Sequence, residues 1–158
     1  MRLSLTSTVS KPRIRSPVMA VWIDRFLIAC LIIVVGVLTI TSLPALGGQT
    51  LGGQMLMAHM MASGALVFGL PVFAFAMLRY LTPRYQTSWT HVIGYLSTLV
   101  AGLLTIASVF YCMLPIPSTS QMHEMMHVHK LAGLAMTPAI LVMLVGFYFT
   151  RSASHRHS

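Results

Sequence analysis

The chain has 158 residues, of which 56% are hydrophobic and only 8% are charged. Soluble domains carry about a quarter charged residues, so a chain this poor in charge could not cover its own surface in water. The composition excludes a water-soluble domain and predicts an integral membrane protein in contact with lipid. The formal net charge of +8 does not indicate nucleic-acid binding, because the basic residues lie in tails and short connections rather than in one patch.

Four apolar stretches follow one another, each long enough for a helix that crosses a hydrocarbon core of about 30 Å. They cover residues 21–43, 55–81, 91–114 and 125–149. The sequence therefore predicts an all-α fold, a four-helix up-and-down bundle in a single domain of residues 20–150. A basic tail, 1–19, precedes this domain, and a polar tail, 151–158, follows it.

The first apolar stretch is longer than the about 7–15 apolar residues of a secretory signal, which favours an uncleaved first helix. Asp24 and Arg25 lie one turn inside its start. At that depth the two side chains are expected to pair with each other or to extend toward the membrane surface.

The distribution of lysine and arginine predicts the orientation of the bundle. Nine of the ten lie in the two tails, at the start of the first helix, or at and after the end of the second helix; only Lys130 lies on the opposite side. Basic residues accumulate on the cytoplasmic side of a membrane. Both termini are therefore expected in the cytoplasm, with the other end of the bundle facing outward.

Histidine and methionine are concentrated in two clusters at the outward end, residues 55–61 and 121–130. His59 and His129 each lie four residues into their apolar stretch, so both are expected roughly 6 Å below the outer ends of two helices that run in the same direction. Two imidazoles at one depth on facing helices are what axial ligation of a b-type haem requires. An ionisable residue inside a membrane helix is also a functional candidate by default.

The other polar residues near these clusters have several interpretations. His127 is an alternative haem ligand, but it lies about 200° around the helix from His129, so both cannot contact one iron. Lys130 could pair with a haem propionate near the outer surface. His91, at the inner end, is interpreted as an interfacial polar residue.

Copper binding is the rival chemistry, because thioether and imidazole groups are ligands suited to copper. The inner half of the chain holds only scattered methionines and one cysteine, which disfavours a transport path and leaves a surface copper site as the alternative. Its candidate ligands are Met55, Met57, His59, Met122, His123, Met126 and His127. A third interpretation is a non-catalytic structural subunit whose small residues let helices pack closely, namely Gly64, Gly69, Gly94, Gly102 and Gly133.

Three segments carry a family resemblance. They are A-H-M-M-A-S-G-A-L-V-F-G from residue 58, with Arg79 at the far end of that helix, L-T-I-A-S-V-F-Y-C-M-L-P-I-P from residue 104, and H-V-H-K-L-A-G-L from residue 127. Over about 55–149 the chain resembles small four-helix membrane cytochromes b, in the manner of the bacterial cytochrome b561 group.

The resemblance implies one haem b on the outer side, with His59 and His129 as axial ligands. It also implies a subunit of a bacterial inner-membrane oxidoreductase that carries electrons between quinol and a redox partner. Di-haem members use a further histidine in the first helix and another deep in the fourth helix. This chain has neither, so no inner haem is expected.

Overall fold

The computed structural model describes residues 17–50, 52–81 and 89–154. Most of the basic tail, Arg84 and the last four residues lie outside the described part of the chain. The elements are α1 (Pro17–Leu46), α2 (Gly53–Met77), a 3₁₀ turn η1 (Leu78–Leu81), α3 (Trp89–Met113) and α4 (Thr119–Ser154). Four helical segments are long and apolar enough to cross a membrane. The protein is therefore an all-α, four-helix integral membrane protein.

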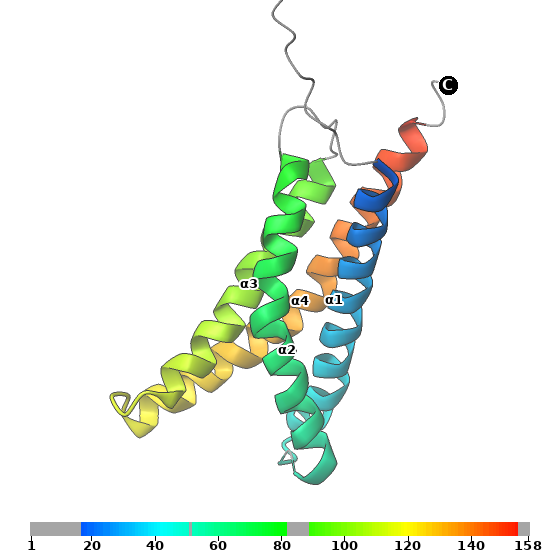
Figure 1. Cartoon of the computed structure of the whole chain (residues 1–158). Helices are drawn as coiled ribbons and strands as arrows, with labels where there is room; N and C mark the ends of the chain where they lie inside the picture. Colours follow the sequence, from blue (N-terminus) through cyan, green and yellow to red (C-terminus); the bar gives the residue numbers. More distant parts are fainter. Residues whose placement is uncertain (1–16, 51, 82–88, 155–158) are drawn as a thin grey trace, which may run out of the picture.

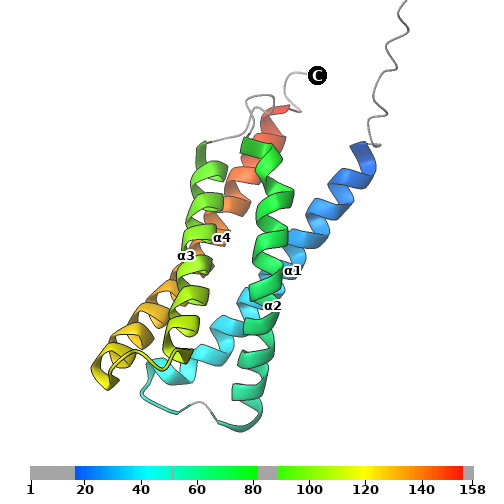
Figure 2. The same ribbon diagram turned by 60° about the vertical axis from the view of Figure 1, so that its left-hand side comes forward.

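The helices run alternately up and down, so the start of α1 and the end of α4 lie at the same end of the bundle (Figures 1 and 2). We call this the closed end, and we call the opposite end, with the α1–α2 and α3–α4 connections, the open end. Figure 1 shows the α3–α4 pair diverging from the α1–α2 pair toward the open end. Contact is most extensive between α3 and α4, less extensive between α1 and α2, and much smaller between the two pairs.

Glycines permit the close approach of α3 and α4 near the closed end. A Cβ atom on Gly94 would collide with the backbone of Met143. A Cβ atom on Gly146 would collide with the backbone of His91. Close backbone approach of this kind is a main source of helix association in membranes, where lipid is as apolar as the side chains.

The five glycines that the sequence suggested for helix packing differ in how close they lie to neighbouring helices. Gly94 and Gly102 both face neighbouring helices, whereas a Cβ atom on Gly64, Gly69 or Gly133 would meet no atom within 4 Å. The sequence interpretation also missed the contact at Gly146. Glycine content alone therefore does not identify which helix faces touch.

The beginning of α4 is fixed by a capping box. The hydroxyl of Ser118 accepts a hydrogen bond from the backbone N–H of Gln121 at 3.4 Å, and the backbone N–H of Ser118 donates to Oε1 of Gln121 at 2.8 Å. This reciprocal arrangement satisfies two backbone donors that a helix start leaves without partners. As a result α4 begins at Thr119 rather than near residue 125, and the 121–130 cluster is helical throughout. At its other end α4 continues to Ser154, into the segment expected as a tail.

A buried ion pair ties α1 to the end of α2 at the closed end. Asp24, which is 2% exposed, pairs with Arg79 and accepts a hydrogen bond from the hydroxyl of Tyr80. The expected pairing of Asp24 with Arg25 is wrong, since the Arg25 guanidinium lies 5.9 Å from the ring centroid of Trp22. Consecutive residues on a helix do not face each other, so the partner of a buried carboxylate has to come from a neighbouring element.

Candidate functional site

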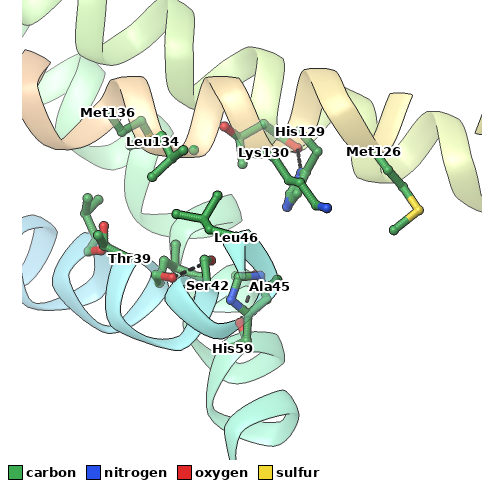
Figure 3. A pocket seen from close by; sticks show the side chains of 15 residues that line it. Thr39, Ser42, Ala45, Leu46, His59, Met126, His129, Lys130, Leu134 and Met136 are labelled. Carbon is green, nitrogen blue, oxygen red and sulfur yellow. Dashed lines mark hydrogen bonds between the residues drawn. The ribbon is translucent and has the colours of Figure 1, made fainter. Parts of the chain in front are cut away.

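A cavity of about 150 Å³ lies in the open-end half of the bundle, where residues from all four helices meet (Figure 3). Most of its lining comes from apolar side chains of α1 and α4. His59 enters from α2, and His129 and Lys130 enter from α4; these three are its ionisable lining residues. Three of the four residues expected to bind a cofactor are therefore brought to one cavity.

The imidazole rings of His59 and His129 lie across this cavity from each other, with ring centroids 6.4 Å apart and ring planes at 71°. Their helices run in the same direction. The two residues do not lie four residues into their helices as expected, because His59 follows the start of α2 by six residues and His129 follows the start of α4 by ten. His127 does not line the cavity and is exposed on α4. The structure thus brings His129, and not His127, to His59.

The ring of His59 is held by a threonine of the neighbouring helix. Its Nδ1 lies 3.0 Å from the hydroxyl oxygen of Thr41 on α1. That hydroxyl donates its own proton to the backbone carbonyl of Val37 at 2.7 Å. A hydroxyl has one proton to donate, so its oxygen must accept from His59, which places the imidazole proton on Nδ1. The Nε2 lone pair of His59 is consequently left for a ligand.

The ring of His129 is held by two residues of α3. Its Nδ1 lies 3.1 Å from the backbone carbonyl oxygen of Thr105 and 3.1 Å from the hydroxyl of Ser108. A carbonyl can only accept, and the Ser108 hydroxyl already donates to the Thr105 carbonyl at 2.8 Å. His129 is therefore also protonated on Nδ1. Metal-bound histidines are characteristically oriented in this way, with the second ring nitrogen donating to a hydroxyl or carbonyl.

The distance between the two rings distinguishes the kinds of metal centre they fit. Two trans imidazoles on one metal ion would have centroids about 6.3 Å apart, given metal–nitrogen bonds of about 2.05 Å and about 1.1 Å from each nitrogen to its ring centroid. A tetrahedral angle at the metal would shorten this to about 5 Å. The observed 6.4 Å leaves room for one metal ion between the two rings and is longer than a tetrahedral angle would give.

The side chains available as metal ligands also bear on the kind of metal centre that the cavity could hold. Within 17–50, 52–81 and 89–154, no group of three or more histidine, cysteine, aspartate or glutamate side chains could hold a metal ion. A protein zinc site uses three or four such ligands. Haem provides its own equatorial nitrogens and takes two axial side chains. Two imidazoles are a complete protein contribution for haem. A copper ion could in addition take the thioether of Met126, which lines the same cavity.

Small residues lie next to the two site histidines on α2 and α4. Ser63 and Gly133 each follow a site histidine by four residues and line the cavity. Residues four apart lie on one face of a helix, so each imidazole has a small residue beside it on the same face. A Cβ atom on Gly133 would meet nothing within 4 Å, so this position borders open space.

The cavity is smaller than the about 300–1,000 Å³ of pockets that enclose drug-sized ligands. A group of the size of haem would extend beyond it. Leu46, Met126 and Lys130 are lining residues that are also exposed, so the cavity reaches the outer surface of the bundle there. The two imidazoles and the apolar lining suit haem, which would be held by His59 and His129.

The seven suggested copper ligands are only partly brought together, because His59 and Met126 both line the cavity. Met55 and Met57 are exposed at the start of α2, whereas Met122, His123 and His127 are exposed near the start of α4. Figures 1 and 2 show these two helix starts well apart at the open end. The five suggested copper ligands outside the cavity are therefore divided between two helix pairs.

His91 lies in the first turn of α3 and is buried between helices, since it is only 2% exposed. Its Nδ1 donates to the backbone carbonyl of Met143 at 3.3 Å, and its ring lies beside the rings of Tyr80 and Phe147, with centroids at 6.1 and 5.7 Å. The close α3–α4 contact at Gly146 buries it. His91 is therefore part of the packing of the closed end.

Comparison of the chain with protein-family models, with curated proteins and with solved structures found no match. The resemblance to membrane cytochromes b gains no support from these comparisons. The candidate site accordingly depends on its own geometry.

Proposed function

We propose that this protein is a membrane-bound b-type cytochrome subunit that holds one haem b between His59 and His129. In this role it carries electrons between quinol and a redox partner, as an electron-transfer subunit of an oxidoreductase. The observation that carries the proposal is that both imidazoles are fixed with the proton on Nδ1, at a ring separation of 6.4 Å that leaves room for one metal ion between the rings. When bound, haem would supply a one-electron couple whose potential depends on its axial ligands and surroundings.

The chain's own residues prepare the site in three ways. Thr41 holds the ring of His59, and Ser108 together with the Thr105 carbonyl holds the ring of His129. Each accepts a hydrogen bond from an Nδ1–H group, which increases the basicity of Nε2. The apolar lining excludes water and lowers the local dielectric. Lys130, exposed beside His129, supplies a positive charge where a carboxylate of the cofactor could reach the surface.

The orientation of the site follows from the basic residues. In the sequence, nine of the ten lysines and arginines lie in the two tails, at the start of the first helix, or at and after the end of the second helix. Among the described residues, Arg25 and Arg79 lie toward the closed end and Lys130 toward the open end. By the positive-inside rule the closed end faces the cytoplasm. The haem would then lie near the outer surface, where quinol in the lipid and a partner outside a bacterial inner membrane can both approach it.

The test is an absorption spectrum of the purified full-length protein, made with haem supplied, before and after reduction with dithionite. We expect a reduced b-type α band in the protein and its loss in His59→Ala and in His129→Ala. His127→Ala is the matched control, because it removes an exposed imidazole two residues away and should retain the band. Absence of the band in the unsubstituted protein, or retention in His129→Ala with loss in His127→Ala, would refute the assignment.

A further inference from the structure

Two histidines outside the cavity form a second close pair. His123 and His127 lie four residues apart on α4, with ring centroids 4.8 Å apart and ring planes at 83°. Their Nε2 atoms are 3.2 Å from each other. Both side chains are exposed, and neither lines the cavity.

The position of this pair is fixed by the local structure of α4. The capping box at Ser118 and Gln121 starts the helix before the first of the two histidines. Residues four apart on an established helix lie on one face, one turn above the other. The two imidazoles therefore converge without any rearrangement of the backbone. The conformational entropy lost when a ligand binds is smaller as a result.

The geometry of the pair suits one ion bound by both rings. With metal–nitrogen bonds of about 2.0–2.1 Å, a separation of 3.2 Å between the two Nε2 atoms corresponds to a nitrogen–metal–nitrogen angle of about 100°. This angle lies between the square-planar value of about 90° and the tetrahedral value of about 109°. The ring separation of 4.8 Å is likewise shorter than the 6.4 Å of the cavity pair. The two pairs thus suit different centres.

We propose that His123 and His127 form a surface site for a divalent first-row transition metal, with copper(II) bound most tightly. Imidazole nitrogen is a good ligand for copper, nickel and zinc, and copper(II) lies at the top of their general affinity order. Because both side chains are exposed, water can fill the other coordination positions. This site is independent of the cavity and does not require that haem be bound there.

The test measures binding of copper(II), nickel(II) and zinc(II) to the purified full-length protein in detergent, by competition with a chromophoric chelator. His155→Ala and His157→Ala form the background, because histidines near the C-terminus could bind metal themselves, and any affinity tag must lack histidine. We expect one copper(II) per chain, bound more tightly than nickel(II) or zinc(II). In His123→Ala and in His127→Ala the affinity for copper(II) should fall at least about tenfold, or 1.4 kcal/mol.

A spacing variant separates geometry from histidine content. His123→Ala combined with Met122→His retains two histidines but places them five residues apart, on different faces of the helix. It should lose binding as the single variants do, whereas His59→Ala should not. Undiminished copper binding in His123→Ala, or its loss in His59→Ala, would overturn the proposal. Haem content measured on the same samples keeps the two sites distinct, because His123→Ala should leave it unchanged.

Discussion

The small residue beside His129 offers the sharpest test of the cavity. Gly133 lies four residues after His129, lines the cavity, and has no atom within 4 Å of the position its Cβ atom would take. Gly133→Leu should therefore place a side chain into the cavity without displacing the protein around it. Leucine also has a higher helix propensity than glycine, by roughly 0.8 kcal/mol, so the helix itself should not be weakened.

The effect follows from the place that the new side chain occupies. Leucine adds four carbon atoms at a position that lines the cavity one turn from His129. They would take up space that a ligand held by His129 needs. We expect haem retention to fall at least about tenfold, which corresponds to 1.4 kcal/mol of binding free energy.

Gly64→Leu is the matched control, because Gly64 lies on α2, is exposed and likewise has no atom within 4 Å of its Cβ position. The assay compares haem content per chain and thermal unfolding in detergent for both variants. A ligand present at 100 times its Kd stabilises the protein by about 2.7 kcal/mol, and a tenfold weaker Kd reduces this to about 1.4 kcal/mol. Only Gly133→Leu should show the reduction. Full haem content in Gly133→Leu, or equal loss in both variants, would refute the placement of haem in this cavity.

Three further predictions concern the supports of the site and of the fold. Thr41→Val should weaken haem binding about 10–100-fold in a haem-transfer titration. Ser108→Ala should weaken it less, because the Thr105 carbonyl still accepts a hydrogen bond from the His129 ring. A larger loss in Ser108→Ala than in Thr41→Val would contradict the assignment of the protons to Nδ1. Arg79→Leu should destabilise the protein by about 3–5 kcal/mol in detergent unfolding, since it leaves a 2%-exposed carboxylate without its cation. Asp24→Leu should lower the free energy of unfolding by less than Arg79→Leu, because the Arg79 side chain is 38% exposed and can still contact water. Equal losses in the two variants would show that the difference in burial between the two partners does not matter. Gly94→Leu should destabilise by at least about 1–3 kcal/mol, because the new side chain meets the backbone of α4, and an unchanged unfolding midpoint would contradict that contact.

Much of the architecture could be predicted from apolar length alone, because a membrane helix needs about 20 apolar residues and only four stretches provide them. The sequence predicted that the fourth helix starts near residue 125, whereas α4 starts at Thr119. The length of an apolar stretch does not detect helical turns made of polar residues. The serine at 118 and the glutamine three residues later form a capping box that sequence inspection could have identified. A local hydrogen-bond pattern was therefore more informative there than hydropathy.

The candidate site was only partly predictable. Helix periodicity separates His127 from His129, and the structure places only His129 beside the cavity. Nothing in the sequence indicates that Thr41 and Ser108 orient the two rings, because that depends on how far neighbouring helices are rotated and shifted along their axes. For the same reason the partner of Asp24 was assigned to its sequence neighbour instead of to Arg79, across a helix interface.

The order of the connections determines how a flat ligand can reach the site. At the open end the chain links only helices of the same pair, from Leu46 to Gly53 and from Met113 to Thr119. The link between the pairs runs from Leu81 to Trp89, both at the closed end. A planar ligand that moves sideways out of the bilayer can therefore pass between the pairs without crossing a loop. If the cavity takes a haem as proposed above, entry from the bilayer between the two pairs would not require the chain to unfold.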